Sequence, residues 1–314
     1  MPKITIVIPT YNNLEELKKC LESLSKQTIK DFNVYICIDG STDGTLEYLK
    51  QSQYSFEIKI FEHPDKNNHG RATTRNLIIN HINSTYIIFL DSDTFAKEDL
   101  VENHIKLLES NKNCISSGSV FYINEKTNLI AYYLNRRGKN NLNHLENLPP
   151  QYFTTQNFAM HSNNFIETQG FNEIFDQSYG GEDTEFAVRL TEKHKFKIIN
   201  NHNSLTYSIM EKSIKKFITQ MYNFGYTNLH LLVELYPKYN FFKTKRILYR
   251  NKNLTKLFLK FNNILSIILK YYLTNNSNGW YKIKYYILHY LVWEEIIRGY
   301  FDKINMQASK IEIF

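Results

Sequence analysis

Short apolar runs alternate with amphipathic segments over the first ninety residues, and this alternation is the feature that most limits how the chain can fold. The apolar runs are rich in Val, Ile, Phe and Tyr, which favours strands, and the segments between them favour helices. Such an alternation indicates an α/β fold with a mostly parallel sheet and helices on both faces. The expected strands are residues 4–8, 32–38, 56–61 and 86–90, and the expected helices are residues 14–24, 42–51 and 71–83.

Local signals predict how the first strand ends and the first helix begins. Pro9 is expected to end the strand, because proline has no N–H for a ladder hydrogen bond. Asn13 is expected to cap the helix, with Glu16 three residues later as in a capping box. Residues 9–12 are therefore expected to lie at the end of the first strand.

The chain divides by charge into two expected regions. Residues 1–209 carry a net charge of −4, whereas residues 210–314 hold 17 Lys and Arg against 6 Asp and Glu, a net charge of +11. The first region is expected to form the α/β domain, in which the polar stretch 124–151 is typical of a binding loop or lid. The second region is expected to be mainly helical. Further elements are expected at 97–110 (helix), 114–120 (strand) and 184–195 (helix).

Three features of the sequence indicate the cellular compartment in which the protein is expected. Cys20, Cys37 and Cys114 have no metal-ligand spacing, which favours buried thiols in a reducing compartment. The chain enters a strand at once, without a charged and then apolar signal segment. No apolar run reaches membrane-spanning length. We therefore expect a cytoplasmic protein.

Two carboxylates follow the fourth expected strand. Asp91 and Asp93 flank Ser92 directly after residues 86–90. Open α/β sheets bind ligands at the carboxyl ends of their strands, and alternating side chains would put both acids on one side of an extended segment. Carboxylates there suit a hard divalent cation, Mg²⁺ or Mn²⁺, which bridges phosphate oxygens. The sequence thus predicts a metal–diphosphate site.

A second acidic cluster, Gly180-Gly181-Glu182-Asp183, precedes an amphipathic segment. The glycines permit a tight turn, and an acid after such a turn is suited to act as a general base. An acidic helix N-terminus stabilised by the helix dipole is the structural alternative, and the two roles are compatible. One acid pair for a metal and one acid for deprotonation indicate a transferase that uses a nucleotide-activated donor.

Five motifs occur in the order that is found in a known family. They are Pro9-Thr10-Tyr11-Asn12, residues 39–45, residues 70–76, Asp91-Ser92-Asp93 and residues 180–183. In this order, and at the ends of expected strands and helices, they resemble the family 2 glycosyltransferases, inverting enzymes with the GT-A fold. The resemblance covers roughly residues 3–209. It implies transfer of a sugar from a nucleotide-diphosphate donor, usually a UDP-sugar, to a glycan or lipid-linked saccharide in polysaccharide biosynthesis.

The resemblance assigns nucleotide-sugar contacts to residues of these motifs. In the family, the acid at Asp39 accepts a hydrogen bond from the donor's base, although Ile38 stands here where relatives have a first acid. Arg71 and Arg75 begin a helix, where anions are favoured, and Arg75 matches the family's Arg-Asn pair. A helix cap and a solvated basic face are the structural alternatives. The expected contacts are Pro9, Tyr11, Asp39, Arg71, Arg75, Asp91, Ser92, Gly180 and Gly181.

The resemblance also assigns the metal ligands and the base. In the family, the second acid of the Asp-x-Asp motif, here Asp93, binds the metal, and the first, Asp91, contacts the ribose or the metal's water. Asp183 is the expected general base, and Glu182 is expected to bind acceptor hydroxyls. Many relatives carry a further metal-binding histidine about 25 residues after the base.

This chain departs from the family at that last position. Ser208 stands where relatives have the histidine. His202, in a predicted turn nearby, is the candidate replacement as a metal ligand, and His161, on the segment before the acidic cluster, is a similar one. Without a histidine, the metal would depend on Asp93, the diphosphate and water, which Mg²⁺ or Mn²⁺ tolerates.

The basic, aromatic region 210–314 leaves several roles open. Aromatic and basic residues are interleaved at 241–246 and 280–286, which suits an amphipathic helix at the anionic inner face of a membrane and fits a lipid-linked acceptor. A helical subdomain that packs on the catalytic body or on a second copy explains the composition equally. A nucleic-acid-binding protein would leave the acidic clusters unexplained, so no nucleic-acid partner is expected. A catalytically inactive protein that binds nucleotide sugars is the third alternative.

Overall fold

The structure is a computed structural model that describes residues 3–137, 142, 144–239, 241, 252–275 and 280–311. The chain forms two compact units. The first unit comprises Met1–Ile123, Leu134–Asp176 and Glu182–Ile209, and the second comprises Asn124–Tyr133, Gln177–Gly181 and Met210–Phe314. The division expected from the sequence, after residue 209, differs from this one by two short segments that belong to the second unit.

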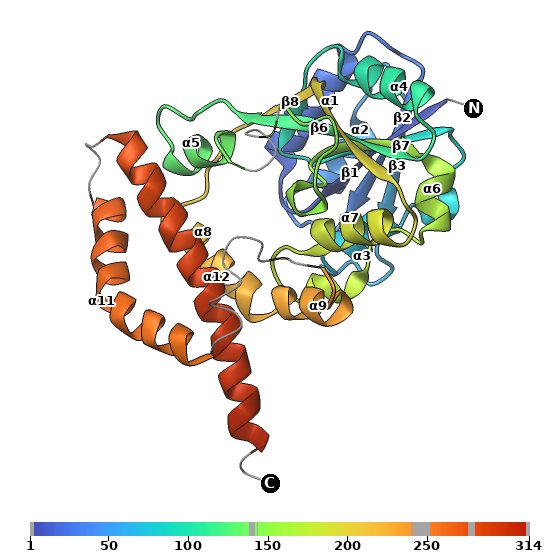
Figure 1. The fold of residues 1–314 in the computed structure, drawn as a ribbon. Helices are drawn as coiled ribbons and strands as arrows, with labels where there is room; N and C mark the ends of the chain where they lie inside the picture. Colours follow the sequence, from blue (N-terminus) through green and yellow to red (C-terminus); the bar gives the residue numbers. More distant parts are fainter. Residues whose placement is uncertain are drawn as a thin grey trace. The chain divides into compact units, whose positions relative to one another are not determined.

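A mixed sheet of eight strands forms the centre of the first unit (Figure 1). Its strands are β1 (Ile4–Thr10), β2 (Phe32–Ile38), β3 (Ile58–Glu62), β4 (Tyr86–Leu90), β5 (Thr94–Ala96), β6 (Cys114–Tyr122), β7 (Asn157–His161) and β8 (Lys197–Ser208). The order is β3-β2-β1-β4-β7-β6-β8-β5. The four strands from β3 to β4 are parallel, as are β6 and β8, while β7 and β5 are antiparallel to their neighbours. The predicted α/β fold is confirmed.

Helices cover both faces of this sheet, as the alternation of strands and helices predicted. Alternate residues of β1 point to opposite faces: Ile6 packs in one apolar core with α1, α2 and α4, and Val7 packs in another with α3, α6 and α7. Cys20 and Cys37 lie buried in these two cores, and burial raises the pKa of both thiols. The helices and 3-10 turns are α1 (Leu14–Ser25), α2 (Thr45–Gln51), α3 (Arg71–Asn76), η1 (Ile79–His81), α4 (Leu100–Ser110), η3 (Pro150–Tyr152), α6 (Ser162–Glu167), η4 (Glu173–Gln177) and α7 (Glu182–Glu192).

Three local predictions were wrong. Strand β1 continues through Pro9 to Thr10. Its pairing with β4 ends at Val7, so Pro9 has a neighbouring strand, β2, on one side only. At such a position the strand tolerates a proline, although proline has no N–H to donate. Asn13 does not cap α1, since its side-chain amide donates to Ser92 Oγ instead. The polar stretch 124–151 is not all loop, because it includes the helix α5 (Leu129–Asn135); within it, residues 138–141 and 143 lie outside the described residues.

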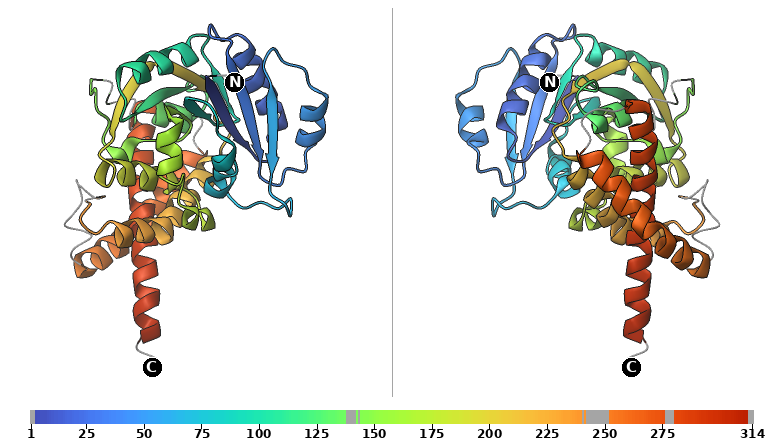
Figure 2. Two further views of the ribbon diagram at one scale, coloured as in Figure 1. Left: turned by 90° about the vertical axis from the view of Figure 1, so that its right-hand side faces the viewer. Right: turned by 90° about the vertical axis from the view of Figure 1, so that its left-hand side faces the viewer.

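The second unit is mainly helical, as expected. Its helices are α8 (Ile214–Tyr226), α9 (Asn228–Leu235), α11 (Lys252–Asn275) and α12 (Tyr281–Ile311), and α5 begins in it. The crossing of α8 and α12 requires glycine on both helices, because a Cβ at Gly225 would meet the Ile296 carbonyl oxygen and one at Gly299 the Tyr222 carbonyl oxygen. Figure 2 shows α11 beside the long α12. None of the helices in the described part of the chain is long and apolar enough to cross a membrane.

Candidate active site

Loops that follow β1, β2 and β4 are joined by side-chain hydrogen bonds. Asn13 Nδ2 donates to Ser92 Oγ at 3.0 Å, and the N–H of Thr42 donates to Asn12 Oδ1 at 2.7 Å. Tyr11, in the first of these loops, is half exposed. Because parallel strands end at one edge of the sheet, three of the sequence motifs meet there, at the edge where open α/β sheets bind ligands.

Asp39 is buried at this edge and holds the loop that precedes α3. Its carboxylate accepts hydrogen bonds from Asn68 Nδ2 at 2.9 Å, from the N–H of His69 at 2.7 Å and from the N–H of Gly70 at 3.2 Å. His63 Nε2 lies 3.5 Å away; burial and then the neighbouring His69 lower the pKa of His63. Much of the acceptor capacity of Asp39 is thus used within the chain, and its contact with a donor base stays a prediction.

The N-terminus of α3 is occupied by a carboxylate of the same chain. Asp176 accepts hydrogen bonds from the N–H of Ala72 at 2.8 Å and from the N–H and Oγ1 of Thr73 at 2.7 and 2.8 Å. Gly70 precedes this helix with a φ of +97°, and a Cβ there would lie 2.5 Å from Asp176 Cβ. The expectation that the helix N-terminus binds an anion of the nucleotide is therefore wrong, because Asp176 already satisfies these N–H groups. Sequence reasoning missed Asp176, which no motif marks.

Arg75 joins the two acidic clusters. Its Nη2 lies 2.9 Å from Asp91 Oδ1, and its Nη1 lies 3.6 Å from Glu182 Oε1. The side chain is 2% exposed, and its guanidinium carbon lies 5.5 Å from the centre of the Phe171 ring. Among the described residues, no group accepts a hydrogen bond from its Nε or Nη1. The observed partners of Arg75 are carboxylates of the chain, so its contact with the nucleotide stays a prediction.

Asp91 and Asp93 lie in a turn at the end of β4. The N–H and Oγ1 of Thr94 donate to the carbonyl oxygen of Asp91 at 3.2 and 2.8 Å. This closes the segment, so the expectation of an extended conformation is wrong. Asp91 is partly buried against Arg75, whereas Asp93 is exposed. An exposed carboxylate beside a second one fits Mg²⁺ or Mn²⁺, which take one or two carboxylates and keep water and phosphate oxygens as other ligands.

His202 lies within β8 and not in a turn, as the sequence had suggested. Residues 202–204 form an irregularity in the pairing of β8 with β6. Ser208, six residues later, pairs with Thr94, next to Asp93. Because residues 202–204 lie between two successive residues of β6, His202 is about four β6 residues, or roughly 13 Å, from that pair, and its role as a metal ligand stays a prediction. No three His, Cys, Asp or Glu side chains gather as a metal site in the described part of the chain.

Asp183, in the first turn of α7, has a perturbed acidity. Burial, followed by the charge of Glu182, raises the pKa of Asp183 to about 7, while the charges of Arg75 and Arg71 act in the opposite direction. A carboxyl group with this pKa is ionised in part at neutral pH and holds a proton better than an ordinary Asp. These are the properties of a general base that operates near pH 7.

The turn before Glu182 belongs to the second unit and is held by a residue of that unit. Gly180 and Gly181 have φ angles of +76° and +100°, which favour glycine. Asn228 of α9 is buried, and its Nδ2 donates to the carbonyl oxygens of Ser178 and Gly180. Sequence reasoning missed Asn228, because no pattern links it to a turn about 50 residues away. Helix α9 thus fixes the turn that immediately precedes the acidic pair in the sequence.

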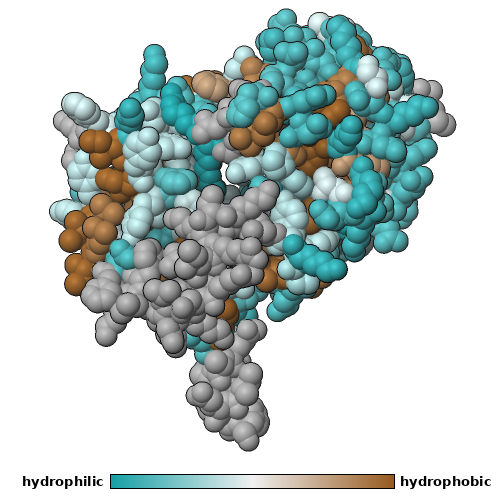
Figure 3. All heavy atoms as spheres, in the orientation of Figure 1, coloured by the Kyte–Doolittle hydropathy of each residue, from teal (hydrophilic) through white to brown (hydrophobic). Residues whose placement is uncertain are grey.

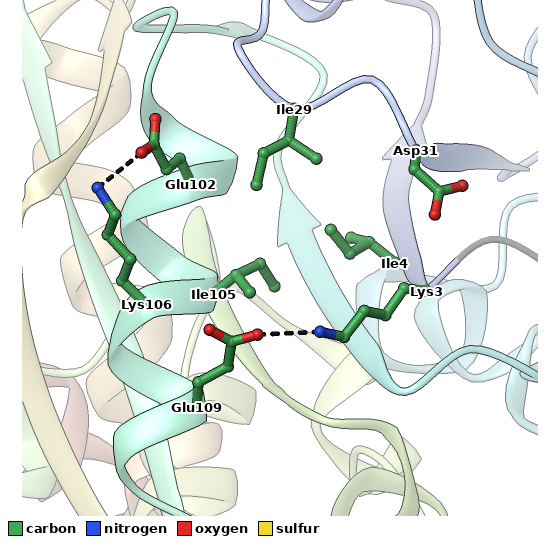
Figure 4. Close-up of a pocket in the computed structure, with 8 residues that line it drawn as sticks. All are labelled: Lys3, Ile4, Ile29, Asp31, Glu102, Ile105, Lys106 and Glu109. Carbon is green, nitrogen blue, oxygen red and sulfur yellow. Dashed lines mark hydrogen bonds and ion pairs between the residues drawn. The ribbon is translucent and has the colours of Figure 1, made fainter.

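A cleft of about 280 Å³ lies at the opposite edge of the sheet, where β1 and β2 begin (Figure 4). Four of its charged side chains form two ion pairs, Lys3 with Glu109 at 2.9 Å and Lys106 with Glu102 at 2.6 Å. Parallel sheets bind ligands at the other edge, so this cleft is not the candidate donor site. Its lining residues are Lys3, Ile4, Ile29, Asp31, Glu102, Ile105, Lys106 and Glu109.

Sequence comparisons place this chain among sugar transferases. The sequence model of the family described as glycosyl transferase family 2 matches residues 5–175, more than half of the chain, and that of the N-terminal domain of galactosyltransferase matches residues 140–213. Chondroitin synthase of Pasteurella multocida is 31% identical over 77% of this chain and 24% of its own length. Hyaluronan synthase of Pasteurella multocida is 31% identical over 64% of this chain and 20% of its own length. The chain thus spans a quarter or less of these relatives.

Solved structures show the same fold at low identity. A mannosyltransferase from Pyrobaculum calidifontis, in complex with GDP-Man and Mn²⁺, aligns with a TM-score of 0.59 and 14% identity over 96% of this chain and 88% of that one. Residues 1–349 of S. aureus TarS, in complex with UDP-GlcNAc, align with a TM-score of 0.54 and 15% identity over 98% and 92%. The fold of these neighbours, the family match and the meeting of the sequence motifs agree. The chain belongs to glycosyltransferase family 2 and has the GT-A fold.

Proposed function

We propose that the chain transfers a sugar, with inversion, from a UDP-sugar to a hydroxyl of a glycan or lipid-linked saccharide. The observation that carries this proposal is the contact of one buried guanidinium, that of Arg75, with both Asp91 and Glu182. It links the acids expected on the donor side to those expected on the acceptor side. The names of the relatives, chondroitin and hyaluronan synthase, favour a polysaccharide product.

Asp183 acts as the general base in this proposal. Inversion by direct displacement requires a carboxylate that removes the proton of the acceptor hydroxyl while the anomeric carbon is attacked from the face opposite the leaving group. The raised pKa of Asp183, about 7, makes its ionised form a stronger base than an ordinary carboxylate. Glu182 is buried beside Arg75, so we assign it the role of keeping this pKa high, in place of the acceptor contact that the sequence suggested.

The donor is held at the carboxyl edge of the parallel strands. Asp93, with Asp91, would hold Mg²⁺ or Mn²⁺, which when bound supplies positive charge to the leaving diphosphate. Arg71 is exposed, and its charge acts on Asp183, so it is placed to contact the diphosphate. The further nucleotide-sugar contacts in this proposal are Pro9, Tyr11, Asp39, Arg75, Ser92, Gly180 and Gly181.

A panel of nucleotide sugars tests this proposal directly. Thermal unfolding of the full chain is followed with UDP-sugars and GDP-Man, each with and without Mn²⁺ or Mg²⁺, and release of nucleotide is then measured for the best ligand. We expect metal-dependent stabilisation by one UDP-sugar, which Asp93→Asn abolishes. Stabilisation by no nucleotide sugar would contradict the proposal, and stabilisation by GDP-Man alone would correct the base.

Two alternatives predict other results. A catalytically inactive partner would bind the donor without releasing nucleotide under any condition. A nucleic-acid-binding protein would show salt-dependent binding of single strands through region 210–314, of which residues 242–251 lie outside the described residues. The buried acidic centre around Arg75 supports the enzyme over both alternatives. A cytoplasmic location, suited to nucleotide-sugar donors, is part of the proposal.

A further inference from the structure

An apolar stripe on the second half of α11 is exposed to solvent. Ile264, Ile267, Ile268 and Tyr271 are each between 57% and 71% exposed, and Leu265 beside them is 45% exposed. The first four have the spacing i, i+3, i+4 and i+7, which places them on one face of a helix. Figure 3 shows apolar side chains gathered over α11 at the left of the view. We call these five residues the α11 stripe.

A different face of α11 packs within the second unit. Ser266 and Leu273 are buried, and Lys270 pairs with Glu295 of α12. These contacts attach α11 to α12 and leave the stripe uncovered by the described residues of this unit. Single exposed apolar side chains are common, but a continuous helical stripe of this kind marks a binding surface.

The net positive charge around the α11 stripe favours a negatively charged partner. Helix α11 carries four lysines, including Lys270, and no acidic residue. Two of the six acids in region 210–314, Glu294 and Glu295, are buried against Arg298 and Lys270, so they add little negative charge to the surface. The region has a net charge of +11. A second copy would bring like charge against like charge, whereas an anionic lipid surface brings the opposite sign.

The residues at the start of α12 also expose aromatic and apolar side chains, as the α11 stripe does. Trp280 is 80% exposed, and Ile283 and Tyr286 are more than half exposed. Trp and Tyr favour the interface between the polar and apolar layers of a membrane, because each combines an apolar ring with a polar group. Part of the interleaved segment 280–286 that the sequence marked is thus exposed in the structure.

We propose that the α11 stripe binds the surface of an anionic membrane, with the helix lying in the plane of the interface. Its isoleucines and Tyr271 would enter the boundary between headgroups and acyl chains, and the net positive charge of region 210–314 would attract the anionic headgroups. The inference deepens the proposed function, because it places the enzyme where a lipid-linked acceptor is found. Binding to vesicles requires no catalysis, so the two proposals fail separately.

Flotation with vesicles tests the inference. The full chain is mixed with vesicles of phosphatidylcholine alone or with about one third phosphatidylglycerol, and the bound fraction is measured against lipid concentration. We expect the wild type to bind the anionic vesicles and the double variant Ile264→Ser/Ile268→Ser to bind them about tenfold more weakly or less. The matched control is Ile123→Ser/Ile166→Ser, which changes two exposed isoleucines of the first unit and should leave binding unchanged.

Three results would overturn the inference. The first is that the wild type fails to float with anionic vesicles. The second is that the stripe variant floats as well as the wild type. The third is that light scattering finds the wild type to be a dimer and the stripe variant to be a monomer. The last result would assign the stripe to a second copy. Equal unfolding temperatures and equal nucleotide release by the wild type and the variants show that folding and catalysis are intact.

Discussion

The pH dependence of the reaction should move when Glu182 is replaced by Gln. In the proposed mechanism, the acid limb of the pH–rate profile follows ionisation of Asp183, whose pKa of about 7 is raised first by burial and then by the charge of Glu182. A group with a raised pKa is active as a base only above that pKa, so the rate should fall as the pH drops through about 7. Removing the charge of Glu182 should lower the pKa and shift the limb to lower pH.

The size of the shift follows from the electrostatics. Like charges on neighbouring side chains interact by about 1–2 kcal/mol at an effective dielectric constant of about 20. Since one pKa unit corresponds to about 1.4 kcal/mol, we expect the limb to move by about one pH unit toward acid. Loss of one of the two partners of Arg75 acts in the same direction, because less of the guanidinium charge is then neutralised and it favours ionised Asp183.

The assay is the pH dependence of kcat/KM for nucleotide release, measured between about pH 5 and 9 with the preferred donor and metal. Glu185→Gln is the matched control, since it removes a buried carboxylate from the same helical turn, one that pairs with Arg189. Its limb should stay in place. An unmoved limb in Glu182→Gln, or a limb at higher pH, would refute the assignment of Glu182 as the group that raises the pKa of Asp183.

Three further substitutions test the supports of the site. Arg75→Met leaves two carboxylates without their buried cation, so unfolding by denaturant should show a loss of about 3 kcal/mol; an unchanged midpoint would contradict this. Gly70→Ala places an alanine at a φ of +97°, with its Cβ against Asp176, so the free energy of unfolding should fall by about 2 kcal/mol or more. A stability equal to that of the wild type would be contrary evidence. Asn228→Ala removes the amide that holds the turn before the acidic pair, so kcat should fall about tenfold while the KM for the donor stays nearly constant. Asn128→Ala, which removes a comparable amide-to-carbonyl bond in the same unit, is its control, and equal kcat losses in both would point to a general structural effect.

The strands could be predicted from the sequence because their signal is local. The run that forms β2 predicted its bounds at Phe32 and Ile38, since β-branched and aromatic residues fit a pleated and buried surface. The order of the motifs then identified the family, and β-α alternation placed three of them at one edge of the sheet. Both inferences rest on residues that are close together in the chain.

The contacts that shape the site were not predictable, because each depends on a partner far along the chain. Asn13 has the residue type of a helix cap, yet its amide bonds to Ser92, 79 residues away. Asp176 caps α3 from 103 and 104 residues away, and nothing near it in the sequence signals that role. His202 was misplaced because an irregularity in the pairing of β8 with β6 depends on both strands. The secondary-structure propensity of a short segment does not predict contacts between residues far apart in the chain.

We infer that the two acidic clusters form one catalytic centre in which Asp183 is the base, and the substitution Asp183→Asn examines this claim. Asn preserves the size of the side chain and removes its basicity. Donor affinity is measured by calorimetry with metal present, and single-turnover nucleotide release is measured on the same preparation. We predict a rate lower by about 10² or more with donor affinity within a few fold of wild type. A variant that keeps most of its rate would contradict the claim.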